Sequence, residues 1–307
     1  NTARDYDIWT DGNEIYIEGV GGSSGALQIG ENSSFGINFD LQASFKLDTN
    51  SRISLSNNDG GGTSGDSSTT GNTLLGYSIN DMDVGSHNNT LIGHKVAGGG
   101  THADMRDNVA VGTLSLYAIS SGDENTAIGK NSLTAITTGS YNTAVGSNSL
   151  VTDDVGNGTT AIGYASLNKQ NTASSGNTFN TAVGANAGYY NVTGTGNTLI
   201  GMNSGIGADG ESHSNNTAVG LNTLRAIETG SENVSVGKDS MYDANTASGV
   251  VAVGVESAYN ITSGSESIAI GKQALYTATT VGANTAVGYQ ALKLNAVASN
   301  TAVGHSA

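Results

Sequence analysis

Histidines and clustered carboxylates are the side chains of this sequence that could hold a metal ion or transfer protons. The five histidines are His87, His94, His102, His213 and His305. No two of them show the HxxxH or HExxH spacing that places two zinc ligands on one face of a helix. We therefore expect them at the surface or at the edges of repeating units, and the sequence predicts no metal site.

Two acidic stretches next to glycine could bind a cation in a loop. They are NDMDVG at residues 80–85 and TDDVGNG at residues 152–158. A calcium ion in either loop is conceivable, although neither stretch has the spacing of an EF-hand. Asp153 and Asp154 are adjacent and therefore do not suggest the separated acid pair of a glycosidase. The sequence predicts no catalytic residue, no cofactor and no enzymatic activity, and it leaves the residues that bind a partner unknown.

Glycine-rich and tyrosine-rich positions are the other candidates for ligand contact. GVGGSSG at residues 19–25 lacks the Lys-Ser/Thr ending of a phosphate-binding loop, so it is expected to be an ordinary loop. Tyrosines recur next to, or a few residues after, a repeated glycine, at Tyr77, Tyr117, Tyr164, Tyr242, Tyr259, Tyr276 and Tyr289. Exposed tyrosines can stack on sugars, but we expect instead that their ring edges cover the corners of the repeating units.

Composition excludes several partners. The formal net charge is −15 with only 11 basic residues, which disfavours nucleic acid and anionic membrane surfaces. Cysteine is absent, so disulfides and thiolate metal sites are impossible. No apolar stretch approaches the ~20 residues of a membrane helix, and no signal peptide is visible. Because the first residue is Asn, we expect a processed or trimmed piece of a longer protein, with a surface suited to an extracellular particle.

A five-residue unit, best represented by NTAVG, organises most of the chain. Fourteen copies end at a glycine, and nine of the thirteen steps from one such glycine to the next have the same length, as from Gly112 to Gly129 and from Gly129 to Gly146. The glycines are Gly76, Gly93, Gly112, Gly129, Gly146, Gly163, Gly184, Gly201, Gly220, Gly237, Gly254, Gly271, Gly288 and Gly304. The repeat is therefore about 17 residues long, and a fixed core separated by segments of variable length is typical of a solenoid, in which strands stack and loops can grow.

Each column of the repeat has its own chemistry. The first position is Asn in eleven copies, the second is β-branched, the third is Ala in ten copies, and the fourth is always aliphatic. Leu recurs four residues after the glycine. This pattern predicts a short strand followed by a corner with positive φ at glycine, with the Asn side chains hydrogen-bonded along their column.

Alternation along the strand places the second and fourth positions on one face and the third on the other. We interpret the face of the second and fourth positions as the interior of the coil. The third position, restricted to Ala, Ser or Leu, is then expected to pack against a close neighbour outside the coil. Replacing Ala144 or Ala286 with Phe should, on this interpretation, block assembly.

A coil with so short a repeat encloses few apolar side chains, which makes a single chain marginal. Burying one aliphatic side chain contributes roughly 1.5–3 kcal/mol, whereas ordering each residue costs about 1.5 kcal/mol. A second buried surface against sister chains would supply the difference. We therefore expect a homo-oligomer whose coils wind about a common axis.

Residues 1–60 lack the repeat and are predicted to form an antiparallel β cap or attachment region ahead of the solenoid of residues 61–307. DIWTDGNEIYIEG at residues 7–19 predicts a hairpin, and strict alternation from Phe35 to Leu47 predicts a half-buried sheet. Residues 57–68 are rich in glycine and predict a joint or exposed loop.

The motif resembles two related groups of fibrous proteins. SESIAIGKQAL at residues 265–275 and ENVSVGKDS at residues 232–240 are similar to the core of the β-roll heads of trimeric autotransporter adhesins. The passage from residue 51 to residue 79 looks more like the repeat shafts of bacteriophage tail fibres and tail spikes. The repeat of this chain is longer than the adhesin repeat. The resemblance covers residues of about 51–307 and implies a homotrimer.

The expected fold is therefore all-β: a trimeric parallel β-solenoid or β-roll with repeats of about 17 residues, preceded by a small antiparallel cap. The resemblance implies a viral tail fibre shaft that reaches, and binds, a glycan or protein on a host cell, located on a virion or extracellular surface. A bacterial surface adhesin is the alternative. An ice-binding protein is less favoured because Val and Ile interrupt the Thr column, and a polysaccharide-degrading spike would require a carboxylate pair in a groove.

Overall fold

The computed structural model describes residues 6–11, 14–19, 71–79, 86–100, 104–172, 176–280 and 282–307. The chain divides into two units, Asn1–Ile53 and Ser54–Ala307. In the first unit, β1 (Tyr6–Asp11) and β2 (Glu14–Gly19) pair antiparallel, in agreement with the predicted hairpin. The sheet predicted around Phe35 to Leu47 lies outside the described residues. Nowhere in the described ranges is there a helix long and apolar enough to cross a membrane.

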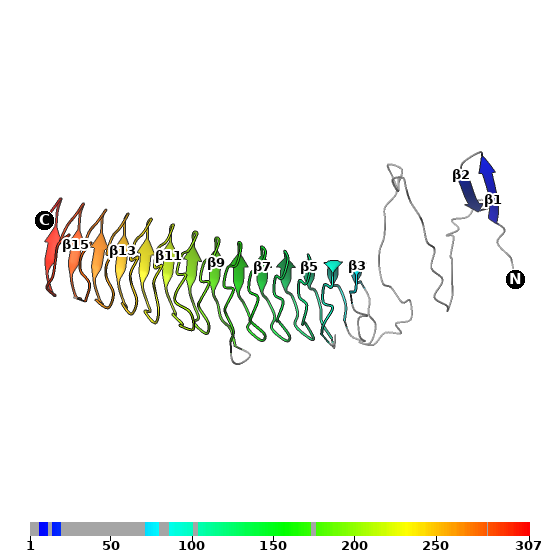
Figure 1. The fold of residues 1–307 in the computed structure, drawn as a ribbon, viewed down its shortest axis with the longest axis horizontal. Coiled ribbons are helices and arrows are strands. Elements are labelled where there is room, and N and C mark those ends of the chain that lie inside the picture. The colour runs from blue at the N-terminus through cyan, green and yellow to red at the C-terminus, as the bar shows by residue number, and fades with distance from the viewer. Residues whose placement is uncertain are drawn as a thin grey trace. The chain divides into compact units, whose positions relative to one another are not determined.

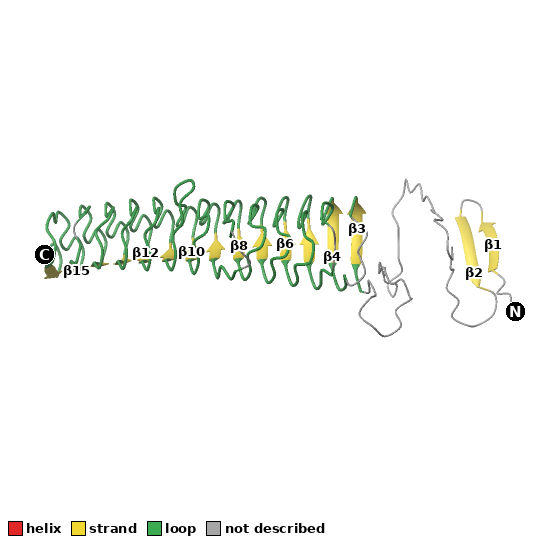
Figure 2. Cartoon of the chain, turned by 90° about the horizontal axis from the view of Figure 1, so that it is seen from below, coloured by secondary structure: helices red, strands yellow, loops and turns green. Residues whose placement is uncertain are grey.

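The second unit is a parallel β-solenoid, which confirms the predicted architecture and period. Fourteen strands form one sheet, and each strand pairs in parallel with the next copy along the chain (Figures 1 and 2). Each strand falls on one copy of the repeat. The strands are β3 (Thr73–Tyr77), β4 (Thr90–His94), β5 (Val109–Val111), β6 (Thr126–Ile128), β7 (Thr143–Val145), β8 (Thr160–Ile162), β9 (Thr181–Val183), β10 (Thr198–Ile200), β11 (Thr217–Val219), β12 (Val234–Val236), β13 (Val251–Val253), β14 (Ile268–Ile270), β15 (Thr285–Val287) and β16 (Thr301–Val303).

The glycine that ends each copy makes the corner of the coil. All fourteen of these glycines have φ between 127° and 151°, a region that L side chains rarely adopt. Close stacking is a second reason for glycine, because a Cβ on Gly146 would lie 2.4 Å from the carbonyl oxygen of Gly163 in the next turn. The corner predicted from the sequence is confirmed.

Other corners use left-handed backbone at residues that carry side chains, which the sequence did not predict. Asn131 and Leu133, two and four residues after Gly129, have φ of 56° and 49°. Left-handed conformations cost an L residue on the order of 1–2 kcal/mol. Hydrogen bonds between turns offset this cost: the Leu133 amide donates to Ser149 O at 3.1 Å, and the Asn131 amide donates to Thr113 O at 2.9 Å.

The first position of the repeat forms a buried asparagine ladder, as predicted. Asn125 Nδ2 donates to Asn108 Oδ1 in the preceding turn at 3.1 Å and to Gly139 O in the following turn at 2.9 Å. The Asn125 backbone amide also donates to Asn108 Oδ1, at 2.9 Å. Each side chain thus joins three turns, and a turn displaced by one residue would leave these buried groups unpaired.

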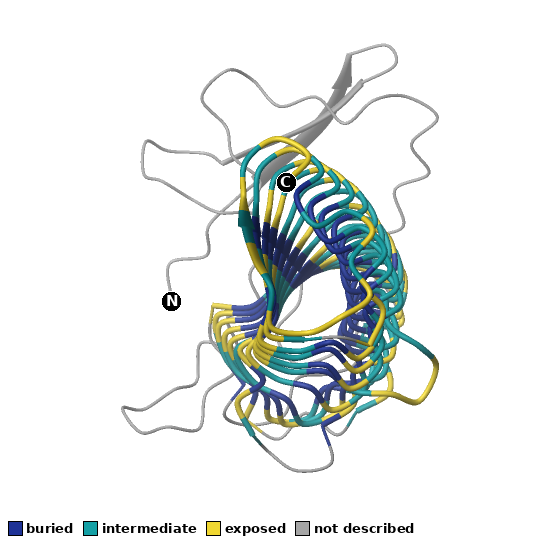
Figure 3. Ribbon diagram, turned by 90° about the vertical axis from the view of Figure 1, so that its left-hand side faces the viewer, coloured by how far each residue is buried: buried dark blue, intermediate teal, exposed yellow. Residues whose placement is uncertain are grey.

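The two faces of the strands are the reverse of those predicted. The third-position alanines, such as Ala144, are completely buried inside the coil of their own chain (Figure 3). The second and fourth positions face outward: Ile162 is 37% exposed and Ile270 is 40% exposed. The alanine column therefore does not pack against sister chains, and the β-branched columns do not fill the interior.

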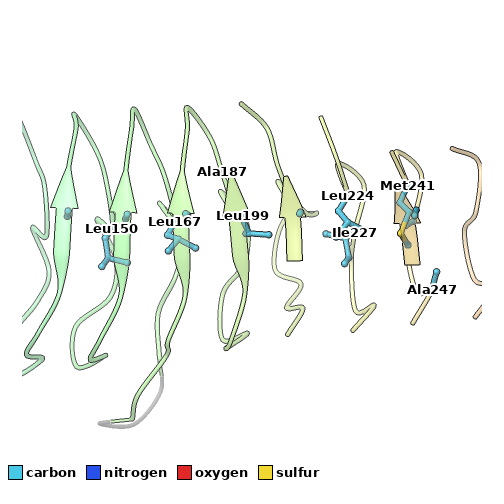
Figure 4. Packing of buried hydrophobic residues seen from close by; sticks show 14 of the residues in the cluster. Leu150, Leu167, Ala187, Leu199, Leu224, Ile227, Met241 and Ala247 are labelled. Atoms are coloured by element: carbon cyan, nitrogen blue, oxygen red, sulfur yellow. The ribbon is translucent and has the colours of Figure 1, made fainter. Parts of the chain in front are cut away.

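The narrow interior explains this arrangement. The leucines four residues after the corner, such as Leu150 and Leu167, lie in the same core as the alanine column (Figure 4). At Leu91 and Leu199, two of the three copies with Leu in the third position, the residue four after the corner is small; for Leu74 that residue, Asn80, lies outside the described residues. Leu199 is followed by Gly205, and a Cβ on Gly205 would lie 2.6 Å from Leu199 Cδ2. Leu91 is likewise matched by Ala97, so the described turns hold at most one large side chain at this pair of positions, and the pairs Ala182–Gly188 and Ala252–Ala258 hold none.

Enlarging the alanine column should destabilise the coil itself. Ala144→Leu is expected to lower the free energy of unfolding by about 1–3 kcal/mol, because overpacking forces the core apart. Adding Leu150→Ala should recover most of the lost stability, because the turn would then hold a large residue in the strand and a small one after the corner, as at Leu91 and Ala97. Urea unfolding of both variants measures this. A variant Ala144→Leu of unchanged stability that fails only to assemble would contradict the interior placement.

Candidate functional site: the outer sheet face and its two rims

The outward side chains of the sheet form one continuous surface along the solenoid. We call the side chains at the second and fourth repeat positions of β4–β16 the outer face. Val, Ile or Thr occupies every position of this face, and no charged residue interrupts it. Large aliphatic side chains are exposed at several levels along it, at Ile128, Ile162, Ile200, Val234, Val253, Ile268, Ile270 and Val303. An exposed apolar stripe of this length is typical of a surface that another molecule covers.

Two columns of residues, many of them exposed, border the outer face. The first rim is the residue immediately before the Asn ladder, and the second rim is the residue immediately after the corner glycine. Their most prominent members are aromatic: Tyr141 and Phe179 on the first rim are 63% and 65% exposed, and Tyr164 on the second rim is 58% exposed. Tyr141 and Phe179 also have left-handed φ of 63° and 50°. Bulky residues seldom adopt this conformation, and they do so here without being buried.

Between the two rims no residue is charged, and the rims themselves carry charges of opposite sign. The first rim carries Asp107, Glu124, Glu232 and Glu266, and the second rim carries Lys130, Lys238 and Lys272. Among the described residues, ion pairs within the chain join Arg106 to Asp104, and Lys238 to Asp239 at 3.2 Å. The outer face is therefore uncharged in its centre, where aliphatic and Thr side chains lie, and charged only at its borders, as an interface with a polar rim would be.

Other tyrosines form a closed stack. Tyr242, Tyr259 and Tyr276 lie in consecutive turns with ring centroids 5.0 and 5.2 Å apart. Arg225 lies 5.3 Å from the ring of Tyr242, and Lys293 lies 5.8 Å from that of Tyr276. Burial raises the pKa of Tyr259, and the neighbouring ionisable groups, Tyr242 first among them, add to this effect. Since the rings cover one another, their faces are not available to sugars, which favours the interpretation that these tyrosines cover the corners.

One histidine lies inside the coil, contrary to the prediction that all would be at the surface or at edges. His213 is 2% exposed, and its Nε2 lies 3.1 Å from Gly205 O. Burial lowers the pKa of His213 to about 4, so the ring is neutral at pH 7. His213 takes the place that Gly122, Gly139 and Gly230 hold in other turns, where each backbone carbonyl accepts from the Asn ladder.

The remaining histidines do not gather. His305 is exposed and stacks on Tyr289 at 4.9 Å, His94 is exposed, and His87 is half-buried. His102 lies outside the described residues. In the parts of the chain that the structure describes, no three His, Asp or Glu residues come together as metal ligands would.

Asp153 and Asp154 have different environments. Asp153 is fully buried, whereas Asp154 is exposed. Oδ2 of Asp153 accepts from Gln170 Nε2 at 2.8 Å, and Oδ1 accepts from Thr172 Oγ1 at 2.7 Å. Gln170 also donates to Thr159 Oγ1 at 3.1 Å and accepts from Asn180 Nδ2 at 2.8 Å. It thereby replaces the ladder amide that is missing at Thr159, so this cluster maintains the ladder. The other acidic stretch, residues 80–85, lies outside the described residues.

Sequence reasoning missed both the buried polar cluster and the outer face. Asp153 and Gln170 stand seven residues after their corner glycines, where Ile119, Ile136 and Ile227 fill the core of other turns. Aligning the repeats over the whole turn, and not over the strand alone, would have exposed this substitution.

No protein-family model, no curated protein and no solved structure matches the chain. The likeness of the repeat to fibrous proteins therefore rests on its motif.

Acid should weaken this fold through His213. Its folded pKa of about 4 lies below the unfolded value of 6.5, so the unfolded chain binds a proton first as the pH falls. Stability is expected to decline between pH 6.5 and 4, by about 3 kcal/mol in all. His213→Gly, which restores the residue of other turns, should remove this part of the decline. Equal pH profiles of urea unfolding for both proteins would contradict the assignment.

Proposed function

We propose that this chain is a structural fibre module that assembles as a parallel homotrimer through its outer face. The observation that carries the proposal is the uninterrupted, uncharged outer face of β4–β16. The solenoid core is already closed within one chain, so the exposed Val and Ile residues need a partner surface outside it.

The dimensions of the face suit a stable assembly. Twelve steps of ~4.8 Å from β4 to β16 make a stack about 60 Å long, and six residue steps between the rims span up to ~20 Å, which gives a face of ~1,200 Å². Stable protein interfaces bury about 800 Å² on each partner. The outer face is therefore large enough for permanent association.

Identical copies are the partners that fit this surface best. A repeating face of constant chemistry matches a second face with the same repeat along its full length, whereas a globular partner would contact only a few turns. The copy number of three follows the resemblance of the motif to trimeric fibres, and three flat faces can enclose a common axis.

We further propose that the assembled fibre reaches a cell surface, as the shaft of a viral tail fibre on a virion or, alternatively, as a bacterial adhesin. Its role is adhesive and mechanical, not enzymatic. The support is the stiff, repetitive stack and the exposed aromatic residues that it displays. The target is a glycan or a protein of the host surface, and neither nucleic acid nor a membrane interior is a partner.

A second function is favoured by one observation. The structure places the Thr column on the outside, and Thr is continuous from β6 to β11, at Thr126, Thr143, Thr160, Thr181, Thr198 and Thr217. A flat row of hydroxyls at ~4.8 Å spacing could order water, as an ice-binding face would. The two functions exclude each other, because a face buried between copies cannot touch ice.

A charge in the centre of the outer face should separate the copies. Ile162→Glu is expected to convert the assembly to folded monomers, because the carboxylate would be desolvated at the interface. Thr138→Glu introduces the same charge at an exposed loop position and should remain assembled. Sedimentation equilibrium distinguishes these results. A monomeric unmodified chain with thermal hysteresis in freezing solutions would instead establish the ice-binding alternative.

Adhesion should depend on assembly. The fluorescently labelled protein is expected to bind at least one strain in a panel of bacteria, and the monomeric Ile162→Glu variant should bind far more weakly, because multivalency is lost. Flow cytometry measures binding, and periodate treatment of the cells separates glycan from protein receptors. Failure to bind any strain, or equal binding by the monomer, would contradict the adhesive role.

A further inference from the structure

The two rims complement each other turn by turn. Each strand has one first-rim residue and one second-rim residue, six positions apart in the sequence, and we call the position of a strand in the stack its level. The pair at one level can therefore be compared for charge and for size along the whole solenoid.

Charges match at every level that has a second-rim lysine. At the levels of β6, β12 and β14 the second rim carries Lys and the first rim carries Glu, and all six side chains are exposed. The pairs are Lys130 with Glu124, Lys238 with Glu232, and Lys272 with Glu266. No described level pairs two like charges.

Side-chain size on one rim also complements side-chain size on the other rim, at the levels that carry an exposed Tyr, Phe, Met or Val on a rim. Where that residue is on the second rim, the first rim is Gly or Ala, and where it is on the first rim, the second rim is small. The first kind comprises Tyr164 with Gly158, Met202 with Gly196, Val255 with Gly249, and Tyr289 with Ala283; the second comprises Tyr141 with Ser147, and Phe179 with Ala185. The levels of β4, β11 and β16 belong to neither kind: they pair His94 with Asn88, the half-buried Leu221 with Asn215, and His305 with Ser299.

These pairs do not form within one chain. A three-residue strand and the residues on either side of it hold the two rims apart, by up to ~20 Å over the six residue steps. Within the described residues, no ion pair joins one rim of the chain to the other. Lys238 is held by Asp239 at 3.2 Å, and it remains exposed enough to face a further carboxylate. The complementarity must therefore act between molecules.

We infer that neighbouring copies lie parallel and in register, with the first rim of one chain against the second rim of the next at the same level. A rotation about an axis parallel to the solenoid produces this arrangement, since it keeps levels aligned and brings unlike rims together. The inference rests on the proposed assembly and specifies its register. In this arrangement the centre of the outer face supplies most of the attraction between the chains, and the rims determine which levels of two chains meet.

The levels around β8 show what fixes the register. Gly158 lies on the first rim between Tyr141 one turn before and Phe179 one turn after. A Cβ on Gly158 would meet only the Phe179 ring within 4 Å, at 3.6 Å. In register, the Tyr164 ring of the neighbour lies over this glycine, between two aromatic residues.

A shift by one turn destroys the match. Tyr164 would then meet Tyr141 or Phe179 of the neighbour, which puts two large rings in one place. The same shift moves Lys272 from Glu266 to Gly249 or Ala283, and Lys238 from Glu232 to Asn215 or Gly249. Steric conflict and loss of ion pairs together disfavour each one-turn shift.

Duplication of one repeat could also copy a Glu and a Lys together. It does not explain why the large residue changes rim between β7, where it is Tyr141, and β8, where it is Tyr164. The left-handed φ of 68–70° at Gly158, Gly196 and Gly249 also favours glycine on the first rim. That conformation does not account for the small second-rim residues opposite Tyr141 and Phe179, which a meeting of the two rims explains.

Engineered cysteines test the register, because the natural chain has none. One variant carries Glu124→Cys and Lys130→Cys, which belong to the same level. The control carries Glu124→Cys and Ala185→Cys, which lie three levels, or ~14 Å, apart along the stack and leave Tyr164 in place. A disulfide requires Cα atoms closer than ~7 Å, which neither pair satisfies within one chain and only the same-level pair satisfies between chains.

Mild oxidation of the assembled protein is expected to link the same-level variant into covalent oligomers that stop at the size of the native assembly, whereas the control should run as a monomer on a denaturing gel. Assemblies of normal mass that cross-link only in the control, or not at all, would overturn the register and leave the proposed fibre intact. Monomeric protein before oxidation would overturn both.

Discussion

The width of the coil is the constraint on which the rest of this structure depends. No described turn holds two large side chains at the third strand position and four residues after the corner. In most turns Ala in the strand is matched by Leu on the returning segment, and two turns hold neither, since Ala182 is matched by Gly188 and Ala252 by Ala258. Where the strand carries Leu199, the residue packed against it on the returning segment is Gly205, which has no side chain to occupy the same space. Because the interior takes only the third position of the repeat, the β-branched second and fourth positions must lie outside. The outward position of the Val, Ile and Thr columns is thus a direct consequence of a narrow core.

Stacking and assembly use different chemistry. Within the chain, the asparagine ladder holds successive turns in register through buried hydrogen bonds, such as those of Asn125 to Asn108 and Gly139. Between chains, uniform Val, Ile and Thr columns would provide attraction without preference for any level. The rims, which vary from turn to turn, can supply that preference. This division resembles the one in coiled coils, where a uniform seam gives stability and flanking charges choose the partner and register.

Sequence analysis predicted the period, the strands, the glycine corners and the asparagine ladder, because each depends on local geometry. It assigned the two faces of the strand the wrong way round, because alternation separates faces without saying which is inside when both are apolar. The signal that identifies the interior is the pair Leu91 and Ala97, in which a large residue in the strand is accompanied by a small residue four positions after the corner. The buried His213 and the left-handed leucines could not be predicted, since they depend on contacts between turns. The surfaces proposed to contact other copies could be defined only once the outer face and its rims had been located.

The most direct test of this account is a density map of the particle in solution conditions, by electron cryomicroscopy. The account predicts several parallel coils at equal height, with alanines inside each coil and the Val, Ile and Thr columns turned toward a shared axis. A solitary coil with these columns in contact with water, or coils joined through their loop sides, would contradict it.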